Sequence, residues 1–321
     1  MSERKNILLG IDIGGTLTKF GFVDFEGNIL KKSLMTTCEF NDFEDYINSL
    51  VNKVNCELPP EYEIISIGVG APNANYFTGY IEEAPNLKWK GKVNIKEKLQ
   101  NLMGKPVFII NDANAGAIGE KTFGAAKFYN NFIFITLGTG LGCGIYCDGK
   151  LLYGQSGIAG EFGHTIVFKD GRQCNCGRKG CLETYVSATG LKRTAVEFLS
   201  KGMESALKNI PENKLTSKKI FEYALKGDKL AIESFKYTAE ILGIALANIA
   251  AILNPEAIFL YGGLSNAGDF IFKPVRYYFD KYLLNVLKNT VKILPSGLPQ
   301  DDASILGASA LCLKELKKIN L

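Results

Sequence analysis

Apolar and polar residues alternate with a period of two near the N-terminus, and short turns interrupt the alternation. Residues 6–35, NILLGIDIGGTLTKFGFVDFEGNILKKSLM, contain three such runs, separated by a glycine turn and by Glu26-Gly27. Residues 132–153, FIFITLGTGLGCGIYCDGKLLY, repeat this order, with Asp148-Gly149 as the second turn. Alternation between Gly, Asn and Asp turns is typical of antiparallel strands. Two such meanders about half a chain apart predict an internal duplication, with one meander in each of two lobes.

Helices and buried strands are predicted around the two meanders. Apolar runs predict strands over 63–71 and 106–112, and a strand, a glycine pair and a helix starting at 254. This order indicates a two-lobed α/β protein. We expect an N-terminal lobe of residues 1–118, onto which a C-terminal helix within 303–321 packs back, and a second lobe of residues 119–302. Apolar residues at helical spacing predict further helices over 42–55, 94–104, 112–124, 183–200, 216–228, 229–253 and 303–319.

Composition narrows the class of protein. The 321 residues are 46% apolar and carry a net charge of +4, with lysines and acids interspersed, so no polybasic nucleic-acid arm is expected. The N-terminus lacks the apolar region of a signal peptide. The longest apolar run, ILGIALANIAAIL, is interrupted by Asn248 and is too short to span a bilayer. We therefore expect a cytoplasmic protein with neither a membrane nor a nucleic acid as partner.

Two glycine-threonine turns occupy equivalent places in the two meanders. In D-I-G-G-T, a carboxylate ends a strand, and glycines at 14 and 15 let backbone N–H groups approach phosphate oxygens. Asp12 could hold the Mg²⁺ that accompanies a nucleotide, although a hairpin turn with an acidic flank explains the same residues. L-G-T-G-L-G, 137–142, is a second turn of this type, and together the turns could clamp a polyphosphate.

Two further sites follow buried strands. Gly262 and Gly263 after AIFLY could admit a base or ribose or serve tight strand–helix packing, and the Ser265 region could cap the next helix. Asn111 and Asp112 end another apolar strand and precede a helix. Either could be the helix N-cap, or Asp112 could be a general base at the carboxyl end of a strand. The local sequence leaves both interpretations open.

The only histidine of the chain lies just upstream of a cysteine cluster. His164, Cys174, Cys176 and Cys181 form the pattern H-x₉-C-x-C-x₄-C. Three thiolates and one imidazole complete a tetrahedral Zn²⁺ shell with no open position, which predicts a structural zinc knuckle over 164–181. Reduced thiols without metal are the alternative, but cysteines this close in a cytoplasmic protein favour a metal. The knuckle would fix the glutamates at positions 161 and 183, whose carboxylates suit polyol hydroxyls.

These residues resemble the ROK family of bacterial sugar kinases and sugar-responsive repressors, most closely its ATP-dependent glucokinases. The resemblance runs from Ile7 to near Leu313. It implies an α/β, two-lobed, actin-like and hexokinase-like (ribonuclease H-like) fold with a duplicated βββαβαβα core and a cleft between the lobes. Its motifs are D-I-G-G-T (12–16), N-D-A-N-A (111–115), L-G-T-G-L-G (137–142), G-E-F-G-H (160–164), C-N-C-G-R-K-G-C-L-E (174–183) and G-G-L-S-N-A-G (262–268).

The resemblance also implies a role for each site residue in phosphorylating a hexose, glucose to glucose 6-phosphate above all. Asp112 is the general base, and His164 also ligates zinc with the three cysteines. The cofactors implied are ATP, Mg²⁺ and structural Zn²⁺, and the assembly implied is a homo-oligomer, a dimer or a tetramer. Sugar hydroxyls are bound by Asn111, Glu161, His164 and Glu183. Phosphates and Mg²⁺ are held by Asp12, Gly14, Gly15, Thr16, Lys19, Gly138 and Thr139, and adenosine lies near Gly262, Gly263 and Ser265.

One departure from the family pattern concerns the substrate. Asn73 stands where the family usually has glycine, in a segment that borders the sugar pocket of family members, and Asn75 with Glu82-Glu83 could also change the preferred sugar. Kinases of N-acetylmannosamine, N-acetylglucosamine, fructose or allose are therefore alternatives to a glucokinase. A sugar-sensing regulator is a further alternative, but we expect no DNA-binding domain before a first strand near residue 6. The last alternative is a structural zinc protein that binds sugar without phosphorylating it.

Overall fold

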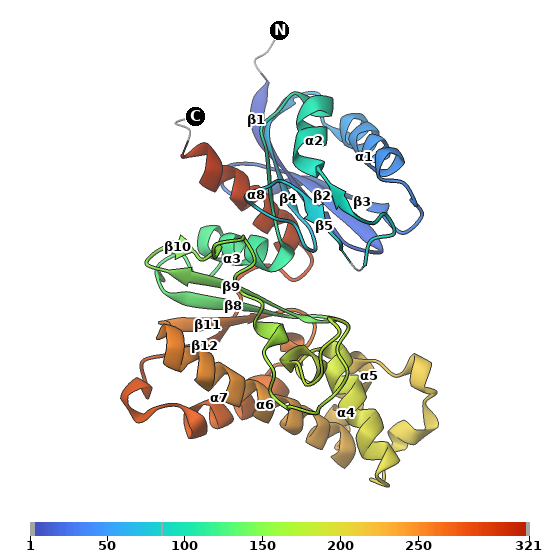
Figure 1. The fold of residues 1–321 in the computed structure, drawn as a ribbon, viewed down its shortest axis with the longest axis vertical. Coiled ribbons are helices and arrows are strands. Elements are labelled where there is room, and N and C mark those ends of the chain that lie inside the picture. The colour runs from blue at the N-terminus through green and yellow to red at the C-terminus, as the bar shows by residue number, and fades with distance from the viewer. Residues whose placement is uncertain (1–3, 85, 319–321) are drawn as a thin grey trace. The chain divides into compact units, whose positions relative to one another are not determined.

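The computed structural model describes residues 4–84 and 86–318, and the chain divides into two compact units. Unit 1 consists of Met1–Phe128, Leu151–Ala159 and Gly297–Leu321, and unit 2 consists of Tyr129–Lys150 and Gly160–Ser296. Each unit has its own sheet and its own helices (Figure 1).

Unit 1 is built on a five-stranded sheet with the strand order β3-β2-β1-β4-β7. The first three strands form the predicted antiparallel meander, and β4 and β7 extend it in parallel. The short pair β5 (Ile81–Glu82) and β6 (Lys92–Val93) is separate. The strands of the main sheet are β1 (Lys5–Ile13), β2 (Leu17–Val23), β3 (Ile29–Thr36), β4 (Tyr62–Gly70) and β7 (Val107–Ile110).

The alternation of β1 places its side chains on two faces, each covered by helices (Figure 1). Ile7 and Leu9 belong to the core that α1 and α2 complete, whereas Leu8 packs on the other side with residues of α8. Helix α8 lies so close that a side chain at Gly68 would overlap the Ala308 carbonyl. Glycine is thus required there for helix–sheet packing. The helices of unit 1 are α1 (Phe43–Glu57), α2 (Ile95–Met103), α3 (Asp112–Thr122) and α8 (Ala303–Leu316); residues 319–321 lie outside the described residues.

Unit 2 repeats the sheet of unit 1. Its strand order, β10-β9-β8-β11-β12, again has an antiparallel meander extended by parallel strands, which confirms the predicted duplication and the α/β class. The predicted third strand of the meander is present but short, and strand β12 was not predicted. The strands are β8 (Phe132–Leu137), β9 (Leu141–Cys147), β10 (Lys150–Leu151), β11 (Ala257–Tyr261) and β12 (Lys292–Pro295).

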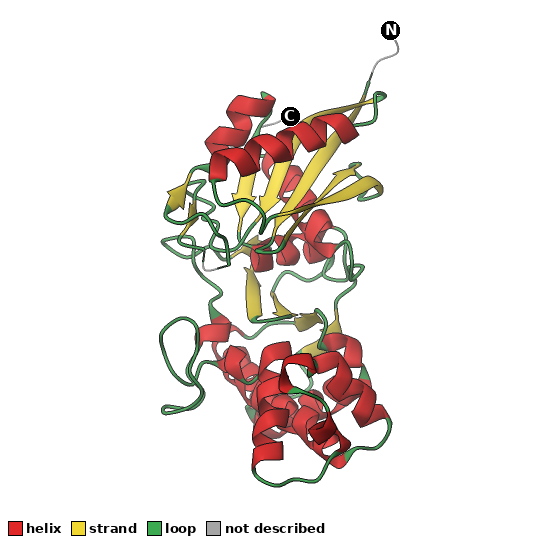
Figure 2. Ribbon diagram, turned by 90° about the vertical axis from the view of Figure 1, so that its right-hand side faces the viewer, coloured by secondary structure: helices red, strands yellow, loops and turns green. Residues whose placement is uncertain are grey.

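Helices supply most of the core residues of unit 2, and they are drawn as red ribbons in Figure 2. Helix α6 is long and apolar enough to cross a membrane by length and composition alone. Leu242, Leu246 and Ala250 on this helix are nevertheless fully buried in the core against the neighbouring helices. The helices are α4 (Ala188–Ser200), α5 (Ser217–Leu225), α6 (Lys229–Leu253) and α7 (Asp269–Tyr282), with 3₁₀ turns that include η1 (Phe162–His164), η2 (Leu182–Thr184) and η5 (Ser265–Ala267).

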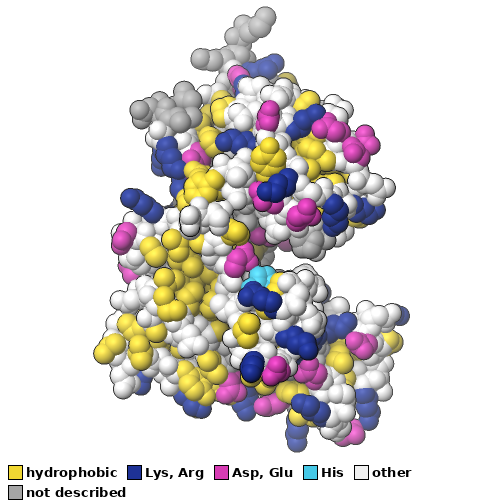
Figure 3. Space-filling model, viewed as in Figure 1, with side chains coloured by type: hydrophobic (Ala, Val, Ile, Leu, Met, Phe, Trp, Pro, Cys, Tyr) yellow, Lys and Arg dark blue, Asp and Glu magenta, His cyan; other side chains and the backbone are white. Residues whose placement is uncertain are grey.

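The charged surface agrees with the small net charge of the sequence. On the face drawn in Figure 3, lysine and arginine side chains are interspersed with aspartate and glutamate. No broad field of one sign covers that face. Long-range attraction of a polyanion to it would therefore be weak.

Candidate functional site

Asn111 and Asp112 in unit 1 have different roles at the start of α3. The Asn111 side chain is the N-cap, since its oxygen accepts a hydrogen bond of 2.8 Å from the backbone N–H of Asn114. Asp112 is the first helical residue, and one of its oxygens accepts from the N–H of Ala113 at 2.8 Å. The residue as a whole is exposed to solvent, although the surrounding protein desolvates its carboxylate. The cap is therefore filled by Asn111, which leaves Asp112 available for chemistry.

Asp112 and Asp12 both have raised pKa values. Desolvation by the surrounding protein raises the pKa of Asp112, and its hydrogen bond from Ala113 opposes that rise. Burial also raises the pKa of Asp12, which the Ser304 hydroxyl opposes, while the charge of Asp112 adds to the rise and Lys19 reduces it. The charge of Asp112 therefore acts on Asp12. Ser304, at the start of α8, was not found from the sequence, because no local pattern links it to Asp12.

The glycine turn after β1 has its predicted form. The N–H of Gly14 closes the turn on the carbonyl of Leu17 at 3.0 Å, so the N–H groups that can meet a phosphate are those of the next residues. Thr16 is exposed, and Lys19 on β2 lies opposite Asp12 on β1. A side chain at position 15 would overlap the carbonyl of Asn86. Local packing alone thus accounts for Gly15.

The equivalent turn in unit 2 differs in one respect. The N–H of Gly138 closes the turn on Gly140 at 3.1 Å, and Thr139 is exposed. A side chain built at Gly138 would meet no atom within 4 Å, and the residue has no positive φ. Neither packing nor backbone conformation requires glycine here. A ligand that approaches the backbone closely would account for a glycine here.

The third glycine site lies after β11. Gly262 has a φ of 101° and is close to the carbonyl of Leu137, so backbone geometry explains it, whereas Gly263 faces open space. The Ser265 hydroxyl donates to the carbonyl of Gly262 at 2.6 Å. The prediction that the Ser265 region caps the next helix was wrong. Helix α7 begins after Gly268 and has no side-chain cap.

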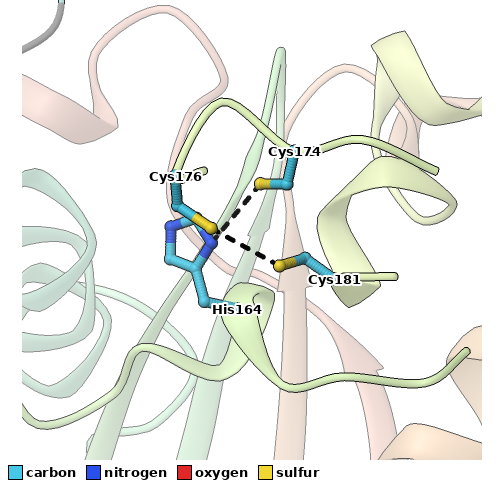
Figure 4. A group of neighbouring side chains, drawn as sticks. All are labelled: His164, Cys174, Cys176 and Cys181. Atoms are coloured by element: carbon cyan, nitrogen blue, oxygen red, sulfur yellow. Dashed lines mark hydrogen bonds between the residues drawn. The ribbon is translucent and has the colours of Figure 1, made fainter. Parts of the chain in front are cut away.

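The four predicted metal ligands converge in unit 2 (Figure 4). Their ligand atoms all lie within 4.8 Å of one another. His164 Nδ1 is 3.7 Å from Cys174 Sγ, and Cys176 Sγ is 3.6 Å from Cys181 Sγ. A tetrahedral zinc ion with Zn–S bonds of about 2.3 Å separates its sulfurs by about 3.8 Å. The donor set and its spacing therefore fit Zn²⁺.

The thiols of this cluster differ in acidity even without a metal charge. Burial would raise the pKa of Cys176, but hydrogen bonds from the backbone and side chain of Arg178 and from the other two cysteines lower it to about 6. Burial and the neighbouring Glu183 raise the pKa of Cys174. At least one ligand is thus a thiolate near neutral pH, which is the form that binds zinc.

Three of the predicted sugar-binding residues lie together at the edge of this cluster. Nε2 of His164 is 3.7 Å from a carboxylate oxygen of Glu161, and Nδ1 is 3.7 Å from Glu183. The Glu183 carboxylate also accepts from Cys174 Sγ at 3.0 Å. The fourth predicted residue, Asn111, belongs to unit 1. Unit 2 thus brings two carboxylates and one imidazole together as hydrogen-bond partners for a polar ligand.

The segment that departs from the family pattern is held by its own side chains. Asn73 has a φ of 53°, as expected for an asparagine that replaces glycine, and its amide donates to the carbonyls of Glu82 and Glu83 at 3.0 and 3.2 Å. Asn75 accepts from the N–H groups of Phe77 and Thr78. The side chains of both asparagines therefore stabilise the conformation of this loop through hydrogen bonds.

Comparison with known proteins establishes the family. The sequence model of the ROK family matches residues 8–315. The chain belongs to the ROK family. It is 37% identical to the glucokinase of Halalkalibacterium halodurans, over 97% of this chain and 96% of the relative. It is 36% identical to the glucokinase of Thermotoga maritima, over 95% and 96% respectively.

Solved structures of ROK proteins share its fold. A ROK family glucokinase from Streptomyces griseus, in complex with glucose and AMPPNP, is 34% identical with a TM-score of 0.80. The likeness covers 95% of this chain and 98% of that one. The actin-like, hexokinase-like class expected from the sequence is thereby confirmed.

Proposed function

We propose that this ROK protein is an ATP-dependent hexose kinase that converts glucose to glucose 6-phosphate. The observation that carries the proposal is the exposed residue Asp112 at the start of α3, relieved of capping by Asn111. The chain as a whole is 36–37% identical to proteins named glucokinase. The proposed substrates, glucose and a nucleotide, correspond to the ligands in the Streptomyces griseus complex.

In this proposal Asp112 accepts the proton of the attacking sugar hydroxyl, which we take to be O6. Desolvation raises its pKa, which makes its carboxylate form a stronger base. Phosphoryl transfer depends mainly on positioning and on neutralising charge, and little on covalent groups of the protein. The remaining residues therefore bind and orient the sugar and the nucleotide.

The two glycine-threonine turns are the proposed phosphate sites. Thr16 and Thr139 are exposed at their turns. Gly138 and Gly263 face open space, so packing does not require glycine at either position. Asp12 offers the oxygen ligand that Mg²⁺ prefers. Bound Mg²⁺ would neutralise the charge of the phosphates. We place the adenosine near Gly262, Gly263 and Ser265.

The cysteine cluster is proposed to hold one structural zinc ion. Its four protein ligands leave no open position, so the metal would shape the loop and take no part in the reaction. Glu161, His164 and Glu183 would thereby be fixed as sugar ligands, and Asn111 is a further proposed sugar ligand in unit 1. A homo-oligomer and a cytoplasmic location stay predictions, which light scattering and cell fractionation can check.

A coupled assay of ADP release tests the function. Purified protein with MgATP is supplied in turn with glucose, mannose, fructose, allose, N-acetylglucosamine and N-acetylmannosamine. The proposal expects the highest kcat/KM with glucose. Preference for another sugar would correct the substrate and keep the kinase, and no turnover with any sugar would refute the proposal. A parallel series with inorganic polyphosphate tests the phosphoryl donor.

A further inference from the structure

Arg172 is a buried arginine that the proposed reaction does not use. Its side chain is 6% exposed, and its guanidinium forms two hydrogen bonds of 2.7 Å with the carboxylate of Glu197 on α4. It also donates to the hydroxyl of Thr194 at 2.9 Å and lies 4.4 Å from the centre of the Tyr185 ring. So many directed contacts on one side chain indicate a fixed point of this region.

The remaining guanidinium contacts reach the backbone next to Glu183. One nitrogen of Arg172 donates to the carbonyl of Thr184 at 2.8 Å and to that of Gly190 at 3.2 Å. The carbonyl of Glu183 itself accepts from the Ser187 hydroxyl at 2.7 Å. The peptide groups on the C-terminal side of Glu183 are therefore held at two successive carbonyls, which limits where its carboxylate can point.

The backbone of Arg172 reaches the cysteine cluster from the other direction. Its carbonyl accepts from the N–H of Gly180, the residue before Cys181, at 2.8 Å. Its own N–H donates to the hydroxyl of Tyr185 at 2.8 Å. Cys174 follows two positions later in the chain. One residue thus links the base of the cluster to the turn that carries Glu183.

We propose that Arg172 is a positioning residue that holds Glu183 for the sugar and the cysteine loop for zinc. The proposal rests on the proposed function. A lysine cannot replace it, because an ammonium lacks the planar set of five donors that reaches Glu197, Thr194 and the Thr184 carbonyl together. Substitution of residues that orient metal ligands typically costs about 10–100-fold in metal affinity or activity.

The test compares Arg172→Lys with wild type and with Arg193→Lys. Arg193 is a suitable control because its side chain contacts the same loop, through one bond of 2.9 Å to the carbonyl of Gln173. We expect Arg172→Lys to raise the KM for glucose about tenfold while the KM for MgATP changes less than twofold. Transfer of zinc to a chromogenic chelator should become about tenfold faster. Arg193→Lys should resemble wild type in the KM for glucose, the KM for MgATP and the rate of zinc transfer.

The outcomes separate the two proposals. Wild-type protein that turns over no sugar contradicts the kinase, and zinc transfer then still tests Arg172. Unchanged glucose KM and zinc transfer in Arg172→Lys, even with a lower melting temperature, would show a purely structural arginine and overturn the inference. If Arg172→Lys does not fold, Glu197→Gln weakens the same network from a half-exposed position, and about threefold changes in the same two quantities are expected. Their absence would overturn the inference equally.

Discussion

Two adjacent polar residues do different work at the start of α3. Asn111 and Asp112 are both good N-cap residues, and the local sequence cannot say which one caps. In the structure Asn111 bonds to the N–H of Asn114, and Asp112 uses one oxygen on the N–H of Ala113. A carboxylate that is neither the cap nor buried in an ion pair has no evident structural role. This assignment is what makes Asp112 the best candidate for the base.

Asp112→Asn should therefore remove turnover and keep binding. The amide retains the shape and can still accept from Ala113, but it cannot take up a proton. We expect kcat to fall by about 10²–10⁴ and the dissociation constant for glucose, measured by calorimetry, to change only a few-fold. A variant with near wild-type kcat would show that another group is the base.

Some features of single residues can be predicted from the local sequence, whereas others depend on contacts with residues that are distant in the chain. Asparagine tolerates the left-handed region, so the turn at Asn73 was predictable, and its φ of 53° agrees. The hydrogen bond from Ser304 to Asp12 joins opposite ends of the sequence. The contacts of Arg172 with α4 likewise exist only in the folded chain. Periodicity carries no information on such contacts between distant elements.

At the level of elements, the two glycine-threonine turns are equivalent in topology and different in packing. Gly15 is enclosed by Asn86, whereas Gly138 faces open space. A methyl group at 138 should therefore be tolerated by the folded protein and obstruct a ligand at the backbone. At position 15 the same methyl group would disturb the local structure. The sequence shows two equivalent turns and cannot show this difference.

Gly138→Ala is accordingly expected to leave the melting temperature within about 1–2 °C of wild type, because surface changes of this kind alter stability by less than ~0.5 kcal/mol. The KM for MgATP should rise at least several-fold, and the KM for glucose should stay nearly unchanged. Gly15→Ala is the contrasting variant and should lower the melting temperature clearly. An unaltered KM for MgATP in Gly138→Ala would place the phosphates elsewhere.

Helix α8 carries a lysine whose charge is unfavourable in the folded protein. Burial, together with the charge of Lys318, lowers the pKa of Lys314 to about 8, against the opposing effect of Glu315. Its ammonium donates to the Tyr153 hydroxyl at 2.7 Å and lies 4.8 Å from the centre of that ring. Tyr153 in turn stacks on Tyr76 at 4.2 Å.

Stability should therefore depend on pH through Lys314. Between about pH 8 and the unfolded pKa near 10.4, the unfolded chain binds the proton and the folded chain does not, so stability rises with pH. Denaturant titrations from pH 7 to 9.5 should show wild type gaining free energy of unfolding relative to Lys314→Met. Lys318→Met is the second variant: without the charge of Lys318 the pKa of Lys314 lies closer to its usual value, so the gain in stability with pH should become smaller. A constant difference between wild type and Lys314→Met would contradict the lowered pKa.

At the scale of the whole molecule, the duplication can be predicted from the sequence, but the assignment of each segment to a unit cannot. The two meanders repeat the same turn chemistry, and both sheets have the same strand order. Residues 151–159 nevertheless belong to unit 1, although unit 2 precedes and follows them. The stacking of Tyr153 on Tyr76 and the bond from Asn75 to the Ser156 carbonyl fix this segment there. Neither contact leaves a periodic signal in the sequence.

The cysteine loop of unit 2 has little regular structure, so a bound metal should account for much of its order. The loop contains only short 3₁₀ turns and isolated bridges between β10 and α4, and its ligand atoms already have the spacing of a tetrahedral zinc site. A metal that binds only the folded state stabilises that state by ~4 kcal/mol when its free concentration is about 1,000 times its dissociation constant. Loss of the metal should therefore be measurable as loss of stability.

Protein purified without chelator should contain about one zinc per chain by atomic emission spectroscopy. Cys176→Ser should lower that content well below one, and chelator treatment of wild type should lower its melting temperature by several degrees and raise the KM for glucose. Cys56→Ser, a change at an exposed cysteine on α1, should keep both zinc and melting temperature. Wild-type protein that contains no zinc and does not respond to added zinc would mean that the four side chains converge without a metal, and that hydrogen bonds alone, such as those of Arg172, order the loop.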